Sequence, residues 1–357
     1  METPTQLLVF CRSGFEQECL LELETAVGKT GISAQGEAFP GHVLLKPDAR
    51  KDTGILIERL SFSRLVFARH IVAVDDGSAP LTPGDRISPL RLRLQTLAER
   101  IGAFSDLWLG WPDNDESRVL APLCRTLHER LEKLLREDGV WDPVAGGVRG
   151  EVVFLSGVRA MTGYSLPCNS SRWPMGVPRL RLPANAPSRS ALKLEEALNW
   201  FSHPGSSNRL VVPGQTAVDL GAAPGGWTWA MVQRGIKVTA VDRGALADHV
   251  TASPLVRHVR EDGFRFRPPF PPDWLLCDIL DKPRRVADLI THWAEKGWCR
   301  NAIFNLKLPM KKRQEEVVLC RDRISAKLRR NGQTFQLHFR QLYHDREEVT
   351  GFLKLGK

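Results

Sequence analysis

The sequence predicts an α/β protein whose C-terminal half folds as a doubly wound, mostly parallel sheet of seven strands, preceded by smaller α+β domains. In that half, short β-favouring runs alternate with helical patterns, which is typical of parallel sheets. The first run ends in a turn of small residues, Gly221 to Gly226, and a helical pattern follows at once. The length of 357 residues exceeds one ordinary domain, so we expect two or three.

Composition indicates a globular protein of a reducing compartment. Hydrophobic residues make up 42% of the chain, and no apolar run approaches the roughly 18 residues that span a bilayer. The N-terminus lacks the basic start and apolar core of a signal peptide. The seven cysteines are scattered without a Cys-x-x-Cys pair, which favours reduced thiols over disulfides or a zinc site. We therefore expect a cytoplasmic protein with no metal centre and no membrane contact.

The net charge of +9 is concentrated in the second half of the chain. Residues 1–160 carry 19 Lys and Arg against 23 Asp and Glu, whereas residues 161–357 carry 31 against 18. A basic surface around a ligand loop suggests a polyanionic substrate such as nucleic acid. A solvated basic face is the alternative, and charge alone does not decide between the two.

The front of the chain is interpreted as two small α+β domains, residues 1–80 and 81–168, without a convincing catalytic cluster. The first alternates strands and helices in the order of a ferredoxin-like sandwich. Its strands are expected at 6–10, 42–46 and 64–74 and its helices at 14–27 and 52–60. The second has expected helices at 90–101 and 117–138 and strands at 106–111, 151–155 and 160–165. His128, in mid-helix, is expected to be packed or solvated and not a ligand.

A basic, proline-rich connector, residues 169–187, is expected to lead into the C-terminal domain, residues 188–357. Prolines disfavour helix, so this connector should be extended. Ser190 is placed to cap the first helix of the domain. The helices are expected at 188–201, 284–296 and 311–330, with one more after the glycine turn. The strands are expected at 217–220, 237–241, 256–260, 274–279, 302–306, 335–344 and 349–355.

The stretch from Thr216 to Trp227 predicts a nucleoside site. Its glycines let a ligand approach the backbone, and the following helix offers free amides. Asp242 ends the second strand, where an acid can hold the two ribose hydroxyls. The dinucleotide fingerprint G-x-G-x-x-G is absent, because its third position, the second glycine, is Ala223, which is followed by Pro224. A turn that merely caps a buried strand is the alternative. Asp262, after the third strand, is placed to accept from an adenine amine.

Four charged residues are predicted to converge beside this turn. Asp278 follows the fourth strand, Lys307 the fifth, and Glu348 lies in the turn before the last strand. Ligands of such sheets bind outside the carboxyl ends of the strands, so these groups should meet there. Lys193, in the helix before the first strand, can approach from the side. Taken singly, each residue could equally be a solvated charge at a strand end.

The order of this set, Lys-Asp-Lys-Glu, resembles that of RNA ribose 2′-O-methyltransferases, and this resemblance implies methylation of a hydroxyl group. A ribose 2′-hydroxyl must lose its proton as it attacks a sulfonium methyl, and a buried lysine beside another cation has its pKa lowered enough to serve as base. We expect Lys307 to be that base, with Lys193 as its cationic neighbour. Asp278 and Glu348 would orient the two amines. No metal is needed, and alignment of the reacting atoms contributes as much as proton transfer.

The turn resembles motif I of class I S-adenosylmethionine-dependent methyltransferases, and the Lys-Asp-Lys-Glu order resembles the tetrad of RNA ribose 2′-O-methyltransferases. Longer segments resemble the bacterial large-subunit ribosomal RNA methyltransferase M (RlmM) family. The segments that carry this resemblance are 10–16, 188–196, 260–264, 304–313 and 341–350. They span nearly the whole chain.

The resemblance implies three domains: a ferredoxin-like domain, a THUMP RNA-binding domain and a Rossmann-like methyltransferase domain. It implies 2′-O-methylation of a cytidine in the peptidyl-transferase loop of 23S ribosomal RNA, with Lys307 as proton acceptor. Glu347 is adjacent to Glu348, so the choice between them stays open. The substrate, naked RNA or an early large-subunit particle, also stays open, and a monomer is expected. Contacts to S-adenosylmethionine are implied for Ser190, Ala223, Pro224, Gly225, Gly226, Asp242, Asp262 and Asp278.

Two other functions are open to this sequence. A non-catalytic RNA-binding protein could use the same fold as a platform, although the lysines and the ligand loop argue against it. Methylation of a base or a protein side chain is the other. Base methylases of this fold tend to carry an Asn/Asp-Pro-Pro-aromatic signature after the fourth strand, and residues 277–283 lack it.

Overall fold

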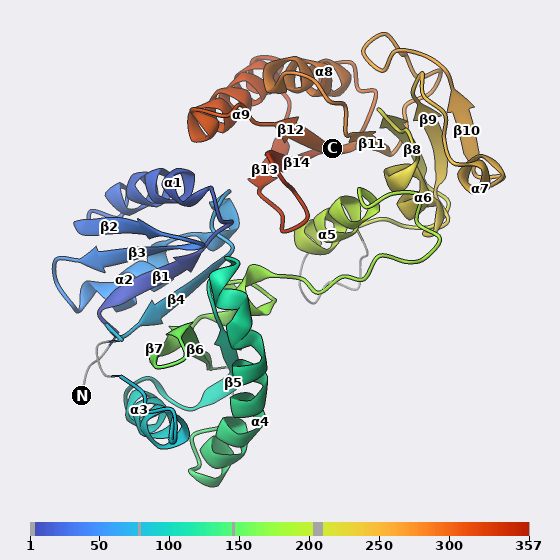
Figure 1. The fold of residues 1–357 in the computed structure, drawn as a ribbon. Coiled ribbons are helices and arrows are strands. Elements are labelled where there is room, and N and C mark those ends of the chain that lie inside the picture. Colours follow the sequence, from blue (N-terminus) through green and yellow to red (C-terminus); the bar gives the residue numbers. More distant parts are fainter. Residues whose placement is uncertain (1–3, 78–79, 145–146, 203–209, 357) are drawn as a thin grey trace. The chain divides into compact units, whose positions relative to one another are not determined.

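The computed structural model describes residues 4–77, 80–144, 147–202 and 210–356. The chain divides into two compact units, Met1–Pro178 and Arg179–Lys357. Each unit is built on one seven-stranded sheet with helices packed against it (Figure 1). Within the described ranges, every helix is too short or too polar to cross a membrane.

The N-terminal unit contains a single sheet in the order β2-β3-β1-β4-β7-β6-β5. Its elements are β1 (Gln6–Phe10), α1 (Glu16–Gly28), β2 (Ala34–Phe39), β3 (His42–Pro47), α2 (Asp52–Arg59), β4 (His70–Val74), α3 (Ile87–Ile101), β5 (Phe104–Gly110), α4 (Ala121–Glu137), β6 (Val148–Ser156) and β7 (Arg159–Ser165). Short 3-10 helices lie at Phe62–Arg64, Glu116–Leu120, Pro167–Asn169 and Pro174–Gly176. Neighbouring strands are antiparallel except β5 and β6. Because β4 pairs with β7, the two predicted front domains share one continuous sheet.

Two expectations about this unit were wrong. The strand expected over 64–74 begins only at His70, because the preceding amides bond elsewhere. Val66 and Phe67 donate their backbone amides to the carboxylate of Glu22 on α1, at 2.6 and 2.9 Å. The edge strand β2 was not predicted, because it is polar and lacks the apolar alternation that marks a strand.

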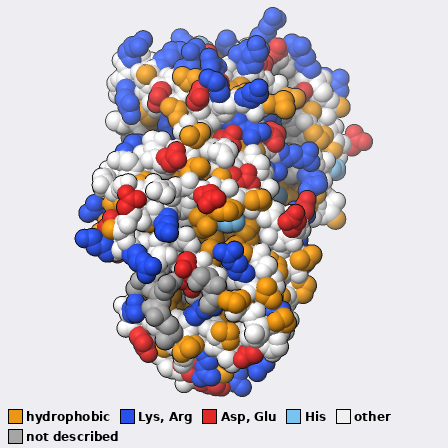
Figure 2. Space-filling view, turned by 60° about the vertical axis from the view of Figure 1, so that its left-hand side comes forward, with side chains coloured by type: hydrophobic (Ala, Val, Ile, Leu, Met, Phe, Trp, Pro, Cys, Tyr) orange, Lys and Arg blue, Asp and Glu red, His pale blue; other side chains and the backbone are white. Residues whose placement is uncertain are grey.

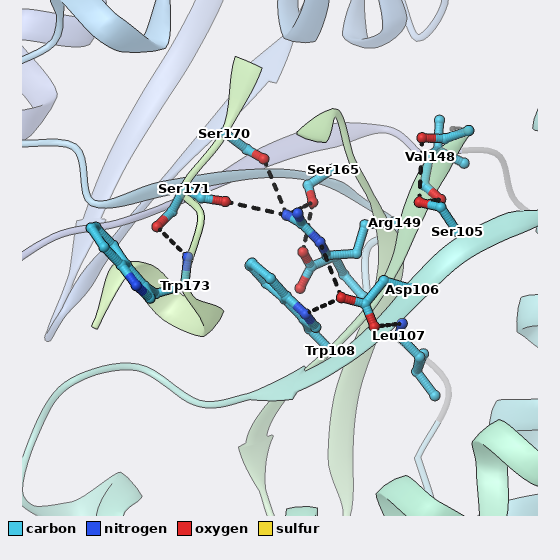
Figure 3. A network of polar contacts seen from close by, with 12 residues as sticks. Ser105, Asp106, Leu107, Trp108, Val148, Arg149, Ser165, Ser170, Ser171 and Trp173 are labelled. Atoms are coloured by element: carbon cyan, nitrogen blue, oxygen red, sulfur yellow. Dashed lines mark hydrogen bonds and ion pairs between the residues drawn. The ribbon is translucent and has the colours of Figure 1, made fainter. Parts of the chain in front are cut away.

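A buried arginine organises the polar interior of this unit (Figure 3). The guanidinium carbon of Arg149, on β6, lies 3.4 Å from the ring centroid of Trp108 on β5. The same guanidinium donates to the hydroxyls of Ser165 and Ser170 and to the backbone carbonyl of Ser171, each at 3.3 Å. The side chain therefore joins β6 to β7 and to the segment that follows β7.

That following segment belongs to the N-terminal unit as far as Pro178. The backbone amide of Ser171 donates to Nδ1 of His70, whose Nε2 pairs with Glu151 at 2.9 Å. Met175 packs on Gly110, where a Cβ atom would lie 2.7 Å from the Met175 Cγ. These contacts fix the first part of the expected connector against the sheet.

The C-terminal unit contains the doubly wound sheet, in the order β10-β9-β8-β11-β12-β14-β13. Its elements are α5 (Ala191–Phe201), β8 (Thr216–Leu220), α6 (Gly226–Val232), β9 (Lys237–Val241), α7 (Asp248–Thr251), β10 (Val256–Val259), β11 (Trp274–Cys277), α8 (Pro283–Glu295), β12 (Asn301–Lys307), α9 (Arg313–Arg330), β13 (Phe335–Arg340) and β14 (Glu348–Leu355). The five strands from β10 to β12 are parallel, and β14 is antiparallel to both of its neighbours. The predicted fold class is confirmed.

Two helical layers enclose this sheet. The pair α5 and α6 covers one face and the pair α8 and α9 the other (Figure 1). Apolar side chains alternate between the faces: Trp274 and Leu276 join the core under α5 and α6. A strand buried on both faces reads as a continuous apolar run, which is why the sequence marks β11 so clearly.

Parallel pairing brings the functional ends of the strands to one edge. Cys277 at the end of β11 pairs with Phe304 of β12, so the residues that follow emerge side by side. At the other flank, Lys307 at the end of β12 is opposite Glu348 at the start of the antiparallel β14. Strands β9 and β11 lie on opposite sides of β8, so the order of the strands reverses there. At such a switch point, a crevice forms at the carboxyl edge of the sheet.

Candidate active site

The glycine turn after β8 closes tightly on two neighbouring segments. Gly221 and Gly225 have φ angles of +77° and +112°, which favour glycine. A Cβ atom on Gly221 would lie 3.1 Å from the backbone nitrogen of Ile279, the residue after Asp278. At Gly226, the first residue of α6, a Cβ atom would overlap the hydroxyl of Ser190. The turn therefore brings its own backbone, the start of α5 and the end of β11 together.

Asp242 completes the cradle from the end of β9. Its Oδ2 accepts the backbone amide of Ala223 at 3.0 Å, and its Oδ1 accepts the amide of Gly244 at 2.8 Å. Each carboxylate oxygen retains lone pairs that can accept from hydroxyl groups. These two hydrogen bonds fix the Asp242 carboxylate, which is predicted to bind a ribose, against the turn.

Asp219 lies buried beneath the turn, on β8. Its Oδ2 accepts from the hydroxyl of Thr228 at 2.7 Å, whereas its buried Oδ1 has no hydrogen-bond partner in the structure. Burial raises the pKa of Asp219 to about 7, and the charges of Asp278 and Asp242 add to the rise. This site therefore contains a carboxyl group that is partly protonated at neutral pH.

Ser190 and Asp262, two of the residues expected at the cofactor, make protein contacts, and the expected helix cap by Ser190 was wrong. Ser190 precedes α5 but makes no capping hydrogen bond to it; its hydroxyl bonds to the hydroxyl of Ser188 at 2.7 Å instead. Asp262 accepts the backbone amide of Phe264 at 2.9 Å and pairs with the exposed Arg243 at 2.8 Å. Ser190 lies beside Gly226 of the turn, and Gly263, next to Asp262, lies beside Leu220 at the end of β8.

The four residues of the predicted tetrad lie together at the edge of the sheet. The Lys193 ammonium pairs closely with Glu348 and lies 3.9 Å from Asp278. The Lys307 ammonium lies 3.6 Å from Asp278 and 3.4 Å from Glu348. Glu347 points elsewhere and pairs with Arg313 at 2.9 Å. The geometry therefore selects Glu348 as the fourth member of this cluster.

The charges within this cluster stabilise one another. Burial alone would lower the pKa of Lys193, but Asp278 and Glu348 outweigh it and raise that pKa. Burial alone would raise the pKa of Glu348, but the hydrogen bond and charge of Lys193, together with Lys307, bring it below its ordinary value. At neutral pH, Lys193 is therefore a cation and Glu348 a carboxylate.

Sequence reasoning missed Glu196, which holds the loop before β14. This buried carboxylate on α5 accepts the backbone amides of Tyr343 and His344 at 2.7 and 2.9 Å and pairs with His344 Nδ1 at 2.7 Å. Since α5 also carries Lys193, one helix fixes both partners of the Lys193–Glu348 pair. A glutamate in the middle of a helix usually faces solvent, so the sequence pattern gives no sign that this one is buried.

Across the parts of the chain that the structure describes, no three His, Cys, Asp or Glu side chains are grouped so that they could hold a metal ion. His128, in α4, donates from Nε2 to the backbone carbonyl of Leu107 at 2.9 Å.

Residues 186–283 match the family model for FtsJ-like methyltransferases, and residues 4–72 match the model for the RlmM ferredoxin-like domain. A relative from Methylococcus capsulatus named ribosomal RNA large subunit methyltransferase M is 44% identical, over 99% of both chains. One of the same name from Cellvibrio japonicus is 45% identical, over 98% of this chain and 99% of that protein.

Solved structures show weaker likeness. TrmN from Thermus thermophilus has a TM-score of 0.33 and 16% identity, over 98% of this chain and 99% of that chain. SMU.472, a putative methyltransferase complexed with SAH, has a TM-score of 0.33 and 13% identity, over 100% and 99%. At scores of this size the likeness carries no functional information.

The doubly wound sheet, the glycine turn at its switch point and the FtsJ-like match together define a methyltransferase. Two relatives align with nearly the whole chain at more than 40% identity, and this likeness identifies the family within the methyltransferases. The chain belongs to the ribosomal RNA large subunit methyltransferase M family, which confirms the resemblance seen in its sequence.

Proposed function

We propose that this protein transfers a methyl group from S-adenosylmethionine to the ribose 2′-oxygen of a cytidine in the peptidyl-transferase loop of 23S ribosomal RNA. One observation carries the proposal most directly: the four side chains Lys193, Asp278, Lys307 and Glu348 meet beside the glycine turn. The naming of the relatives, all ribosomal RNA large subunit methyltransferase M, supports the substrate class.

The residues around the turn fit S-adenosylmethionine. The left-handed backbone at Gly221 and Gly225 shapes a tight turn at the carboxyl edge of the sheet, and Asp242 offers two oxygens beside it where a ribose needs acceptors. The buried, unpartnered Oδ1 of Asp219 adds a polar atom that lacks a protein partner. Ser190, Ala223 to Gly226, Asp242, Asp262 and Asp278 would hold this cofactor. When bound, it supplies a methyl group activated by a sulfonium.

Lys307 is the proton acceptor in this proposal. Lys193 is committed to Glu348 and stays a cation, whereas the Lys307 ammonium lies 3.4 Å or more from both carboxylates and is the more exposed amine. In its neutral form, Lys307 takes the proton of the ribose hydroxyl at Nζ as the oxygen–carbon bond forms. Asp278 and Glu348 orient that amine, and Lys193 offsets their charge.

The charge of the C-terminal unit supports an RNA substrate. Residues 179–357 carry 30 Lys and Arg against 18 Asp and Glu, an excess that favours a polyanionic partner. Figure 2 shows basic side chains spread over the visible face of the molecule. The proposal includes a THUMP RNA-binding domain at residues 81–168, a monomer, and a cytoplasmic location, where ribosomal RNA is found. Naked RNA and an early large-subunit particle are both admissible substrates.

Mapping of methylated nucleotides in 23S ribosomal RNA from cells with and without the gene tests the proposal. We expect one cytidine to lose its 2′-O-methyl group in the deletion strain and to regain it on complementation. A lost base methylation would identify a different acceptor atom. An unchanged map would contradict the proposal, and absence of heat on titration with S-adenosylmethionine would indicate a non-catalytic binding protein.

A further inference from the structure

A line of buried polar groups runs beneath the tetrad. The side-chain amide of Asn305, on β12, donates to Asp278 Oδ1 at 2.9 Å. On the adjacent β14, the hydroxyl oxygen of Thr350 lies 2.8 Å from Asn305 Oδ1. The same hydroxyl oxygen lies 3.0 and 3.2 Å from the two carboxyl oxygens of Asp345. Asn305, Thr350 and Asp345 are each at most 1% exposed.

The donors and acceptors in this line can be assigned by counting protons. Asp278 faces two lysines and offers only acceptors, so the Asn305 group next to it is the NH₂ group. Asn305 Oδ1 therefore faces Thr350 and must accept from its hydroxyl. A hydroxyl has one proton, so Thr350 can only accept from Asp345. The Asp345 carboxyl group must then carry a proton of its own.

The alternative assignment, in which Asp345 is ionised, leaves a buried acceptor without a hydrogen bond. If Thr350 donated to an ionised Asp345, Asn305 Oδ1 would lie 2.8 Å from an oxygen that offers it no proton. A buried acceptor without a donor loses its hydrogen bond to water and gains none in return, which destabilises the fold. Protonation of Asp345 removes this conflict, and its Oδ2 still accepts the backbone amide of Leu342 at 2.9 Å.

The surroundings of Asp345 also disfavour its charge. It is buried, and two carboxylates act on it, Glu348 on β14 and Glu196 on α5, while the cation Lys193 on α5 acts in the opposite direction. Burial first, and Glu348 second, raise the pKa of Asp345 well above its ordinary value. Neutral Asp345 adds no third negative charge to those of Asp278 and Glu348.

We propose that Asp345 is a positioning residue that keeps its proton at neutral pH and, through Thr350 and Asn305, holds Asp278 in place against the two lysines. The inference rests on the proposed function, because the orientation of Asp278 affects the rate only if the tetrad performs the transfer. Asp345 does not contact the reacting atoms. It acts by restricting the rotation of the Asp278 carboxylate. A misplacement of a catalytic group by about 1 Å lowers the rate on the order of 100-fold.

Matched variants test each link. Thr350→Val keeps the shape but removes the hydroxyl; we expect kcat to fall roughly 10- to 100-fold while the KM for a 23S transcript and the affinity for S-adenosylmethionine stay unchanged. Thr350→Ser restores the hydroxyl and should recover kcat to within about 3-fold. Asp345→Asn donates to Thr350 and accepts from Leu342, so it should also stay within about 3-fold, with the wild-type pH profile. Asp345→Ala should behave as Thr350→Val does.

The outcomes separate this inference from the function on which it rests. Lys307→Ala, assayed alongside, tests the tetrad: full activity there would contradict the proposed function. If Lys307→Ala is inactive but Thr350→Val equals wild type, the inference alone is overturned. A pH profile of Asp345→Asn that is shifted from wild type would show that Asp345 is ionised, and that too would overturn it. Urea unfolding of each variant confirms that the assays are made on folded protein.

Discussion

Lys193 and Glu348, 155 positions apart in the chain, form an ion pair that joins α5 to the first residue of β14. Neither partner is more than 14% exposed, so the pair is largely desolvated. The same two residues border the Lys307 amine, and thus one contact serves both the stability of the unit and the arrangement of its tetrad.

Lys193→Met removes the charge and keeps most of the aliphatic stem. It leaves Glu348 buried without its closest partner, so we expect the free energy of unfolding in urea to fall by about 3 kcal/mol and methyl transfer to be lost. The double variant Lys193→Met/Glu348→Gln should recover much of the stability but none of the activity. Recovery of activity in the double variant would show that the pair is only structural.

Glu196→Gln tests the anchor of the loop before β14. The substitution replaces one acceptor oxygen by a donor that faces backbone amides, so we expect about 2 kcal/mol of destabilisation and a kcat lowered roughly 10-fold. Glu195→Gln is the matched control, because Glu195 pairs with Arg234 in a more exposed setting. It should cost less than about 1 kcal/mol and leave kcat unchanged. Equal kinetic effects of the two variants would contradict a specific role for Glu196.

Asp219→Asn should change the pH dependence of stability. In the folded protein, burial raises the pKa of Asp219 to about 7, whereas the unfolded chain ionises near its ordinary value. Between about pH 4 and pH 7 the folded state keeps a proton that the unfolded state loses, so this residue lowers wild-type stability as the pH rises. The variant lacks this loss. Its free energy of unfolding, relative to wild type, should rise over that window by a few kcal/mol and level off above it. A difference independent of pH would contradict the raised pKa.

Arg149→Ala probes the N-terminal unit alone. The loss of the stacking on Trp108 and of three hydrogen bonds should destabilise that unit by about 3 kcal/mol in urea unfolding followed by tryptophan fluorescence. The exposed Arg159 on the neighbouring β7 provides the control, and Arg159→Ala should cost less than about 0.5 kcal/mol. The affinity for S-adenosylmethionine should stay unchanged in both, since the glycine turn lies in the other unit. A weakened affinity in Arg149→Ala would show that the two are coupled.

Much of the C-terminal unit could be predicted because local and global signals agree there. The strands β8, β9, β11 and β12 are apolar runs bounded by turn residues, and the rule that parallel strands share a carboxyl edge needs only their order. That rule alone predicts that Asp278 and Lys307 lie together, and in the structure Lys307 Nζ lies 3.6 Å from Asp278 Oδ1. The catalytic roles of these residues stay predictions, and so do the cofactor contacts predicted for the residues around the turn.

The rest depends on contacts that no local pattern contains. Val66 and Phe67 are apolar enough for a strand, yet their backbone amides donate to Glu22, more than 40 positions earlier. Asn305, Asp345 and Thr350 are polar residues whose hydrogen bonds become visible only when β12 and β14 are paired. Glu196 has its partners 147 and 148 positions away. Buried polar networks of this kind escape hydrophobic periodicity, which records only the apolar faces.

The central claim is that a neutral Lys307 amine accepts the ribose proton, and the most direct test compares Lys307→Ala with Lys307→Arg in single-turnover methyl transfer to 23S ribosomal RNA. Arginine keeps the positive charge but does not give up its proton, so the pair separates a base from a cation. We predict that both variants lose methyl transfer by at least about 1,000-fold while each still binds S-adenosylmethionine in calorimetry. Substantial transfer by Lys307→Arg would show that the site needs a cation there and would contradict the account.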